Sequence, residues 1–131
     1  MRIELVSIMV LDQEHALKFY TETLGFVKKH DIPLGGGNRW LTLVSEEAQD
    51  GTELLLEPAP LHFEPAKVYQ KAVYDAGMPY TQFNVDDVQA EYDRLTQLGV
   101  KFSVPPTNAG TAKIAVFDDT CGNNMQIVEI L

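Results

Sequence analysis

Short apolar runs in this chain alternate with segments whose apolar residues recur at helical spacing, and the two patterns predict strands and helices. Residues 2–10 are rich in β-branched side chains and predict the first strand. Asp12 follows this run and is placed to cap a helix from about residue 13 to residue 24. Gly25 then suits the left-handed backbone position that ends a helix.

The rest of the chain continues in the same way. Strands are predicted at residues 26–32, 38–44, 52–57, 80–85, 100–104, 111–117 and 124–130. A second helix starts after Asp86 or Asp87 and is closed by Gly99. A linking helix is predicted over residues 65–76, and its expected buried stripe consists of Val68, Tyr69, Ala72, Val73 and Ala76.

Residues 10–26 and 85–100 share one order of features: strand end, aspartate cap, amphipathic helix, Leu-Gly and an apolar residue. Such a repeat predicts a duplicated unit. The expected fold is α+β, with two βαβββ modules in tandem that form curved mixed sheets with helices on the outer face. We expect one domain over residues 1–131. Its parts are a module at 1–60, a linking helix at 64–77 and a second module at 79–131.

Composition narrows the class of protein. The 131 residues are 45% hydrophobic and 22% charged, which is typical of a soluble globular domain. The net charge of −9 disfavours nucleic acid and anionic membrane surfaces as partners. No apolar run approaches the roughly 20 residues of a membrane helix, and no signal peptide is evident. The single cysteine, Cys121, cannot form an internal disulfide, so we expect a cytoplasmic protein.

The pattern of specific residues along the chain resembles that of the vicinal oxygen chelate superfamily. This superfamily includes glyoxalase I, extradiol dioxygenases and bleomycin-resistance proteins. The resemblance covers Ile3 to Ile130. It rests on Asp12, Phe19, Tyr20, Leu24, Gly25 and Phe26, on the run 52–57, and on Phe117, Asp118, Asp119, Gly122, Asn123, Gln126 and Ile127. It implies paired βαβββ modules, a homodimer and a cupped pocket on each sheet.

The resemblance also implies where a metal would be held. The metal-dependent members place ligands in the first and fourth strands of each module, which here fall on Leu5, Glu57, Tyr80 and Gln126. A first-row divalent metal prefers imidazole and carboxylate ligands. Only Glu57 supplies such a group, so we predict that this protein has no metal site and no cofactor. The alternative is a divalent metal at Glu57.

The remaining reactive side chains point to no other known chemistry. His15, His30 and His62 share no metal-ligand spacing with one another or with Glu57. Cys121 lies in a predicted polar turn without a nearby basic residue to stabilise a thiolate. Phosphate-binding and nucleophile-elbow motifs are absent.

Strand alternation places several polar side chains on the inner face of the predicted sheets, beside Leu5, Met9, Leu55 and Val128. Apolar walls with a few polar groups favour a small-molecule ligand. The candidate ligand-binding residues are Ser7, Trp40, Glu57, Tyr80, Gln82, Asn84 and Gln126. The protein is therefore predicted to bind or sequester a small organic ligand.

Two other functions stay open. In the first, the protein is a lyase, isomerase or dioxygenase of the glyoxalase type. Glu57 would then act as a general base, with Tyr80 or Gln126 holding the developing oxyanion, or a divalent metal would bind at Glu57. In the second, the sheets are filled by their own side chains and the protein is a structural or interaction module.

Overall fold

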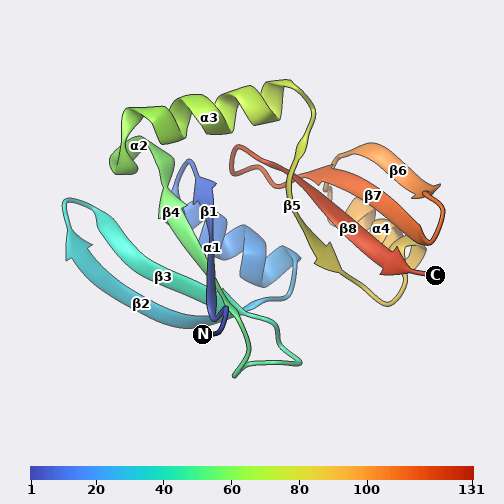
Figure 1. Ribbon diagram of the computed structural model, residues 1–131, viewed down its shortest axis with the longest axis horizontal. Helices are drawn as coiled ribbons and strands as arrows, with labels where there is room; N and C mark the ends of the chain where they lie inside the picture. Colours follow the sequence, from blue (N-terminus) through green and yellow to red (C-terminus); the bar gives the residue numbers. More distant parts are fainter. The chain divides into compact units, whose positions relative to one another are not determined.

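The computed structural model describes residues 1–131, and the chain divides into two compact units, Met1–Gln70 and Lys71–Leu131. Figure 1 labels their helices and strands. The division falls inside the linking helix. Each unit contains one four-stranded sheet and one helix that follows the first strand of that sheet. The predicted single domain with its module bounds stays a prediction.

The first unit has strand order β1-β4-β3-β2, with β1 parallel to β4 and the other neighbours antiparallel. Its elements are β1 (Leu5–Val10), α1 (Gln13–Lys18), the π-helical turn η1 (Phe19–Thr23), β2 (Val27–Gly35), β3 (Asn38–Val44), β4 (Glu53–Pro58), α2 (Ala59–His62) and most of α3 (Glu64–Asp75). The four-residue helix α2 starts beside Pro58 and Pro60 and was not predicted from the sequence.

The second unit repeats this arrangement with strand order β5-β8-β7-β6, β5 being parallel to β8. Its elements are β5 (Pro79–Asn84), α4 (Val88–Gln97), β6 (Phe102–Asn108), β7 (Ala112–Asp118) and β8 (Asn124–Ile130). Pro105 and Pro106 lie in β6, an edge strand, where a missing N–H is tolerated. The predicted fold class, two tandem βαβββ modules with mixed sheets, is confirmed.

Aspartate caps start both principal helices, as predicted. Asp12 accepts a hydrogen bond from the His15 N–H at 2.7 Å, and Asp87, rather than Asp86, accepts from the Ala90 N–H at 2.9 Å. The first helix does not run as one α-helix to residue 24, because its last turn is π-helical (Phe19–Thr23). Gly25 follows with φ of +91°, in the left-handed region that favours glycine.

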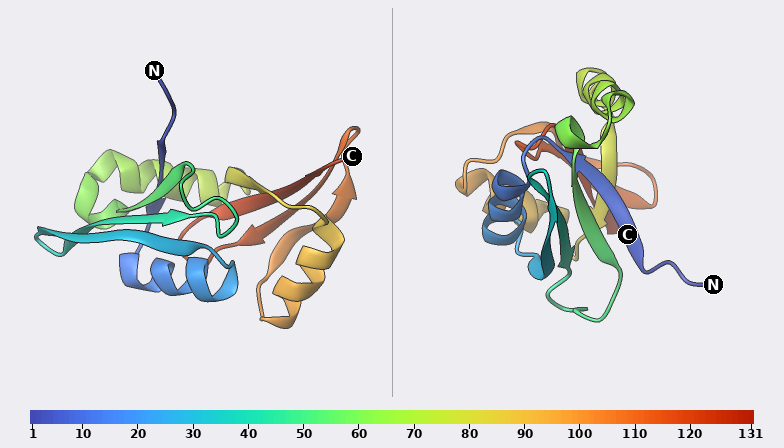
Figure 2. Two further views of the ribbon diagram at one scale, coloured as in Figure 1. Left: turned by 90° about the horizontal axis from the view of Figure 1, so that it is seen from below. Right: turned by 90° about the vertical axis from the view of Figure 1, so that its left-hand side faces the viewer.

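The helices cover one face of each sheet. In the first unit, α1 lies along one side of the strands (Figure 2) and its Gln13 side chain reaches the strand backbone. The same side of the sheet carries the fully buried Ile8, Leu41, Leu43 and Leu56. This layer of aliphatic side chains between helix and sheet is the hydrophobic core of the unit, and burial of this area is its main stabilising term.

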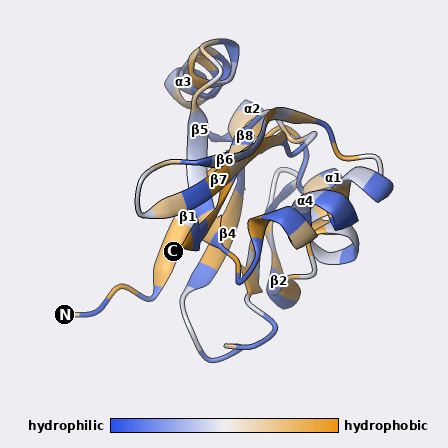
Figure 3. Ribbon diagram, turned by 90° about the vertical axis from the view of Figure 1, so that its right-hand side faces the viewer, coloured by the Kyte–Doolittle hydropathy of each residue, from blue (hydrophilic) through white to orange (hydrophobic).

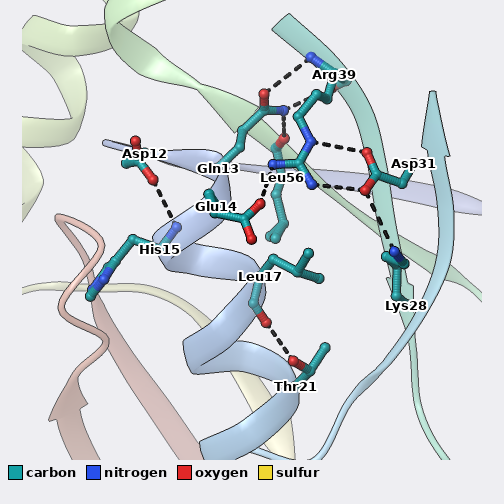
Figure 4. A network of polar contacts seen from close by, with 10 residues as sticks. All are labelled: Asp12, Gln13, Glu14, His15, Leu17, Thr21, Lys28, Asp31, Arg39 and Leu56. Atoms are coloured by element: carbon teal, nitrogen blue, oxygen red, sulfur yellow. Dashed lines mark hydrogen bonds and ion pairs between the residues drawn. The ribbon is translucent and has the colours of Figure 1, made fainter. Parts of the chain in front are cut away.

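Gln13 is a buried polar residue that sequence periodicity did not single out. Its Nε2 donates to the carbonyl oxygens of Arg39 (2.7 Å) and Leu56 (2.8 Å), and its Oε1 accepts from the Arg39 N–H at 3.1 Å. The side chain is thus bonded to β3 and to β4 from the first turn of α1, as Figure 4 shows. Burial of the amide is tolerated because these bonds satisfy its polar atoms.

The predicted stripe of the linking helix is wrong. In α3 the buried residues are Ala66 and Gln70, whereas Val68 and Tyr69 are 59% and 62% exposed. The buried side is the one that carries Gln70, whose Nε2 donates to the Met9 carbonyl oxygen at 3.0 Å, a long-range contact that hydrophobic periodicity does not reveal. Hydrophobicity at helical spacing therefore selected the wrong face.

Arg39 connects the helix to the edge of the sheet on the core side. Its Nε and Nη2 donate to the two carboxylate oxygens of Asp31 at 2.9 and 2.8 Å, and its Nη1 donates to Glu14 at 2.7 Å. Lys28 Nζ also lies 3.6 Å from Asp31 Oδ2 (Figure 4). The hydrogen bond to Asp31 raises the pKa of Arg39, and the same contact lowers the pKa of Asp31 below its ordinary value of 3.8.

This pair predicts a defined pH dependence. A carboxyl group whose pKa is lowered by folding stabilises the protein above its unfolded pKa, and this contribution is lost as the pH falls through the folded pKa. Asp31→Asn is therefore expected to reduce the free energy of unfolding at neutral pH, and the difference from the wild type should shrink as the pH falls below 3.8. Urea denaturation at several pH values measures it, with Asp50→Asn as control. A difference that is independent of pH would contradict it.

The β7–β8 connection, predicted as a turn, is built around a buried carboxylate. Asp119 is 0% exposed, and its Oδ1 accepts from the N–H groups of Cys121 (2.7 Å) and Asn123 (2.9 Å). Its Oδ2 accepts from Asn123 Nδ2 at 3.0 Å. Thr120 has φ of +59°, and Cys121 is fully buried rather than part of an exposed turn. The chain has no helix with the length and hydrophobicity to cross a membrane.

Candidate functional site

The face of each sheet that points away from the helix is called here the open face. In β3, Arg39 bonds to Glu14 of α1, so side chains in its phase of the strand point to the helix. Trp40 and Thr42 are in the other phase and therefore point to the open face. Ser7 and Thr42 both pair with Leu55, and Met9 pairs with Glu57. Because partners across a ladder share a face, these side chains form one surface.

Three of the predicted ligand-binding residues, Ser7, Trp40 and Glu57, lie on this open face. They come from β1, β3 and β4, and the apolar Met9 and Leu55 separate them. The Glu57 side chain is half-buried and makes no hydrogen bond or ion pair in the structure. A carboxylate in this state has lost part of its hydration without a protein partner, so it is available to a ligand.

A polar cluster on the same face was missed by the sequence reasoning. Thr42 Oγ1 donates to Glu53 Oε1 at 2.7 Å and accepts from the His30 N–H at 3.2 Å, and His30 Nε2 lies 3.7 Å from the same Glu53 oxygen. The residues come from β2, β3 and β4. Only the pairing of β2 with β3 brings His30 opposite Thr42, across a register shift that no local pattern marks.

In the second unit, the open face is identified by Glu129, whose carboxylate accepts from the Val88 N–H of α4 at 2.9 Å and so points to the helix. Gln126 and Val128, in the other phase of β8, point away from it. Gln82 pairs with Gln126 and Asn84 pairs with Val128 in the parallel ladder. Three predicted residues, Gln82, Asn84 and Gln126, therefore share this open face.

Two of these residues contact each other directly, since Gln126 Nε2 donates to Gln82 Oε1 at 2.9 Å. The aliphatic side chains of Val116 and Val128 are buried on the same face, at 4% exposed each, and Val116 is the ladder partner of Gln126. The open face of the second unit therefore carries an amide pair beside aliphatic side chains that are already buried. This chemistry favours hydrogen bonding to a neutral ligand.

Tyr80 does not follow the alternation on which its prediction depended. The register shifts between Pro79 and Thr81, which pair with Asn124 and Met125, so Tyr80 is the extra residue of a β-bulge. The Tyr80 side chain is half-buried. Gln82 is assigned to the open face by its ladder partner Gln126, but Tyr80 lies at the register shift and cannot be assigned in this way.

The positions at which a family metal was expected do not fit a metal ion. Leu5 has no donor atom, and Gln126 supplies an amide that is bonded to Gln82. Nowhere in the chain do three histidine, cysteine, aspartate or glutamate side chains gather in a geometry that could hold a metal. Glu57 supplies one ligand, whereas protein zinc sites use three or four ligands from cysteine, histidine, aspartate or glutamate side chains.

Comparison with known proteins identifies the family to which this architecture corresponds. The family model described as Glyoxalase/Bleomycin resistance protein/Dioxygenase superfamily matches residues 2–127. The chain is 56% identical over 129 residues to the uncharacterized protein YurT of Bacillus subtilis (strain 168), covering 98% of this chain and 99% of YurT.

Two further proteins bear on function. The solved structure of TnmS3, an antibiotic binding protein from Streptomyces sp. CB03234, matches with a TM-score of 0.76 and 30% identity, over 100% of this chain and 97% of TnmS3. The probable chloroplastic lactoylglutathione lyase of Arabidopsis thaliana is 30% identical over 132 residues, which cover 95% of this chain and 34% of that protein. The chain belongs to the Glyoxalase/Bleomycin resistance protein/Dioxygenase superfamily.

Proposed function

We propose that this protein binds a small organic ligand on the open faces of its sheets and holds it without chemical change. The observation that carries the proposal is the half-buried Glu57 carboxylate, which has no partner in the protein and lies among the apolar side chains of Met9 and Leu55. A ligand site combines apolar surface with a few polar groups that give orientation.

Charge restricts the class of ligand in the first unit. Two glutamates, Glu53 and Glu57, lie on the open face, and the protein has a net charge of −9. Both features favour a cationic or hydroxylated ligand over an anionic one. The similarity to TnmS3, described as an antibiotic binding protein, supports binding rather than turnover as the function.

A thermal-shift screen with cationic drugs and with dicarbonyl compounds tests the proposal. A ligand that binds only the native state stabilises it by RT ln(1 + [L]/Kd), about 2.7 kcal/mol at a ligand concentration 100 times Kd. We expect a cationic compound to raise the melting temperature and Glu57→Gln to weaken that effect. Glu46→Gln, in an exposed loop, is the matched control. A library in which no compound changes the melting temperature would overturn the proposal.

A second candidate is metal-free lyase or isomerase chemistry, which the similarity to the probable lactoylglutathione lyase favours. Glu57 would take a proton next to a ligand carbonyl, a role that general bases perform with typical rate gains of about 10²–10⁴. Glu57→Gln is then expected to reduce turnover of a dicarbonyl substrate by that factor while binding persists. Turnover that is equal in both proteins would exclude this role. Metal analysis of the purified protein tests the divalent-metal alternative separately.

We also propose that the protein forms a homodimer. In each unit the first strand, β1 or β5, is the edge of its sheet, and β1 exposes Leu5 and Val6 at 39% and 46%. Figure 3 shows β1 coloured as hydrophobic. A partly exposed apolar edge strand favours pairing with another chain. Sedimentation at micromolar concentration that gives only the monomer mass would contradict this assembly.

A further inference from the structure

The amide pair on the open face of the second unit has unused hydrogen-bonding capacity. The bond from Gln126 to Gln82 uses one N–H of Gln126 and one lone pair of the Gln82 carbonyl oxygen. The Nε2 group of Gln82 and the Oε1 atom of Gln126 make no hydrogen bond in the structure. Since Gln126 is half-buried and Gln82 is exposed, the free capacity lies toward solvent.

A primary amide has one donor and one acceptor side by side in a plane. Its best partner is a group with the same two functions in reverse order, which is why Gln and Asn bind the N6–N7 edge of adenine through two hydrogen bonds. The contact with Gln126 restricts the Gln82 side chain before a ligand arrives, so less conformational entropy is lost on binding. If the oxygen and nitrogen of the Gln82 amide exchange positions, the side chain still presents one donor beside one acceptor.

We propose that Gln82 recognises a ligand edge with adjacent N–H and C=O groups, as in a lactam, an imide or a carboxamide, and that Gln126 is the positioning residue for Gln82. The half-buried Ile114, which is the ladder partner of Val128 on the same face, supplies apolar surface for the ring that carries this edge. The inference rests on the proposed function and adds the ligand chemistry of the second unit.

Three probes of similar size test the inference by ¹H–¹⁵N NMR titration. 2-Quinolinone carries the lactam edge, and N-methyl-2-quinolinone lacks its N–H donor. 2-Aminoquinoline is used in mildly acidic buffer, where its protonated ring nitrogen and its amino group present two donors and no acceptor. 2-Quinolinone is expected to shift the side-chain amide signals of Gln82 and Gln126. Its dissociation constant should be about fivefold lower than that of the N-methyl compound, because one neutral hydrogen bond is lost in the latter.

Variants separate recognition from general hydrophobic binding. Gln82→Leu should abolish the preference for the lactam over its N-methyl derivative, and Gln126→Leu should reduce it, whereas Gln89→Leu, on the exposed side of α4, should leave it unchanged. Gln82→Glu should reverse selectivity toward 2-aminoquinoline, since a carboxylate accepts two hydrogen bonds from such an edge and repels a carbonyl oxygen. This reversal is an outcome that a structural role of Gln82 does not produce.

Equal affinity for the lactam and its N-methyl derivative would overturn the inference, as would unchanged selectivity in Gln82→Glu. Absence of any shift of the Gln82 and Gln126 amide signals with all three probes would also overturn it. The proposed function would survive these results if the thermal-shift screen had found a ligand whose titration shifts other open-face residues. A screen without any ligand would remove the proposed function itself, so the two failures are distinguishable.

Discussion

Replacement of Gln13 by alanine is expected to lower the free energy of unfolding of the first unit by about 2–4 kcal/mol. The side chain makes three hydrogen bonds to the backbone of Arg39 and Leu56, and it is only 5% exposed. Its loss leaves buried carbonyl and amide groups without partners, and each such group costs about 1–3 kcal/mol unless water replaces the amide.

Urea denaturation measures the effect, and hydrogen exchange assigns it to the first unit. Gln13→Leu retains volume but not the three bonds, so it should be destabilised to a similar degree. Gln89→Ala is the matched control, because Gln89 lies on an exposed helical surface and bonds only to Asp93. It should change stability by less than about 0.5 kcal/mol. An equally small change in Gln13→Ala would show that these bonds contribute no net stability.

The second large effect is expected at Asp119, where alanine should destabilise the second unit by about 3 kcal/mol or more. The carboxylate organises the β7–β8 turn through two backbone N–H groups and the Asn123 side chain, and it is fully buried. Removal leaves buried donors unpaired. It also removes the restraint on Thr120, whose φ of +59° is unfavourable for a residue other than glycine.

Asp119→Asn gives a graded test of this turn. Its carbonyl oxygen still accepts from the N–H groups of Cys121 and Asn123, but its amide nitrogen then faces the Asn123 amide nitrogen, donor against donor. We expect the free energy of unfolding of Asp119→Asn to lie between those of the wild type and of Asp119→Ala. Thermal or urea denaturation measures it, with Asp50→Ala in an exposed loop as control. Equal stability of all three proteins would show that the turn does not depend on the carboxylate.

Local signals were sufficient for the strands and for the capped starts and glycine ends of the paired helices, but not for α2 or the π-helical turn. Asp12 caps the first helix as predicted, and Gly25 and Gly99 adopt positive φ at the ends of the paired helices. These features depend on a few neighbouring residues, so sequence reveals them directly. The linking helix was different, because its buried side carries Gln70, which donates to the distant Met9 carbonyl oxygen.

The candidate site was predicted only as far as strand alternation reaches. Alternation placed Ser7 with Glu57 and Gln82 with Gln126 on shared faces, and the ladders of the two units agree with it. It failed at Tyr80, where a bulge interrupts the period of two. Whether any of these residues binds a ligand stays a prediction.

The sequence by itself determined the strands, the capped helices, the duplication and the family, because each depends on short-range chemistry or on the order of residues along the chain. The tertiary structure decided which side chains meet. His30 reaches Glu53, Gln13 bonds to two strands and Gln126 donates to Gln82 only through strand register and helix docking. Register depends on long-range pairing, and a shift of one residue turns every side chain to the other face.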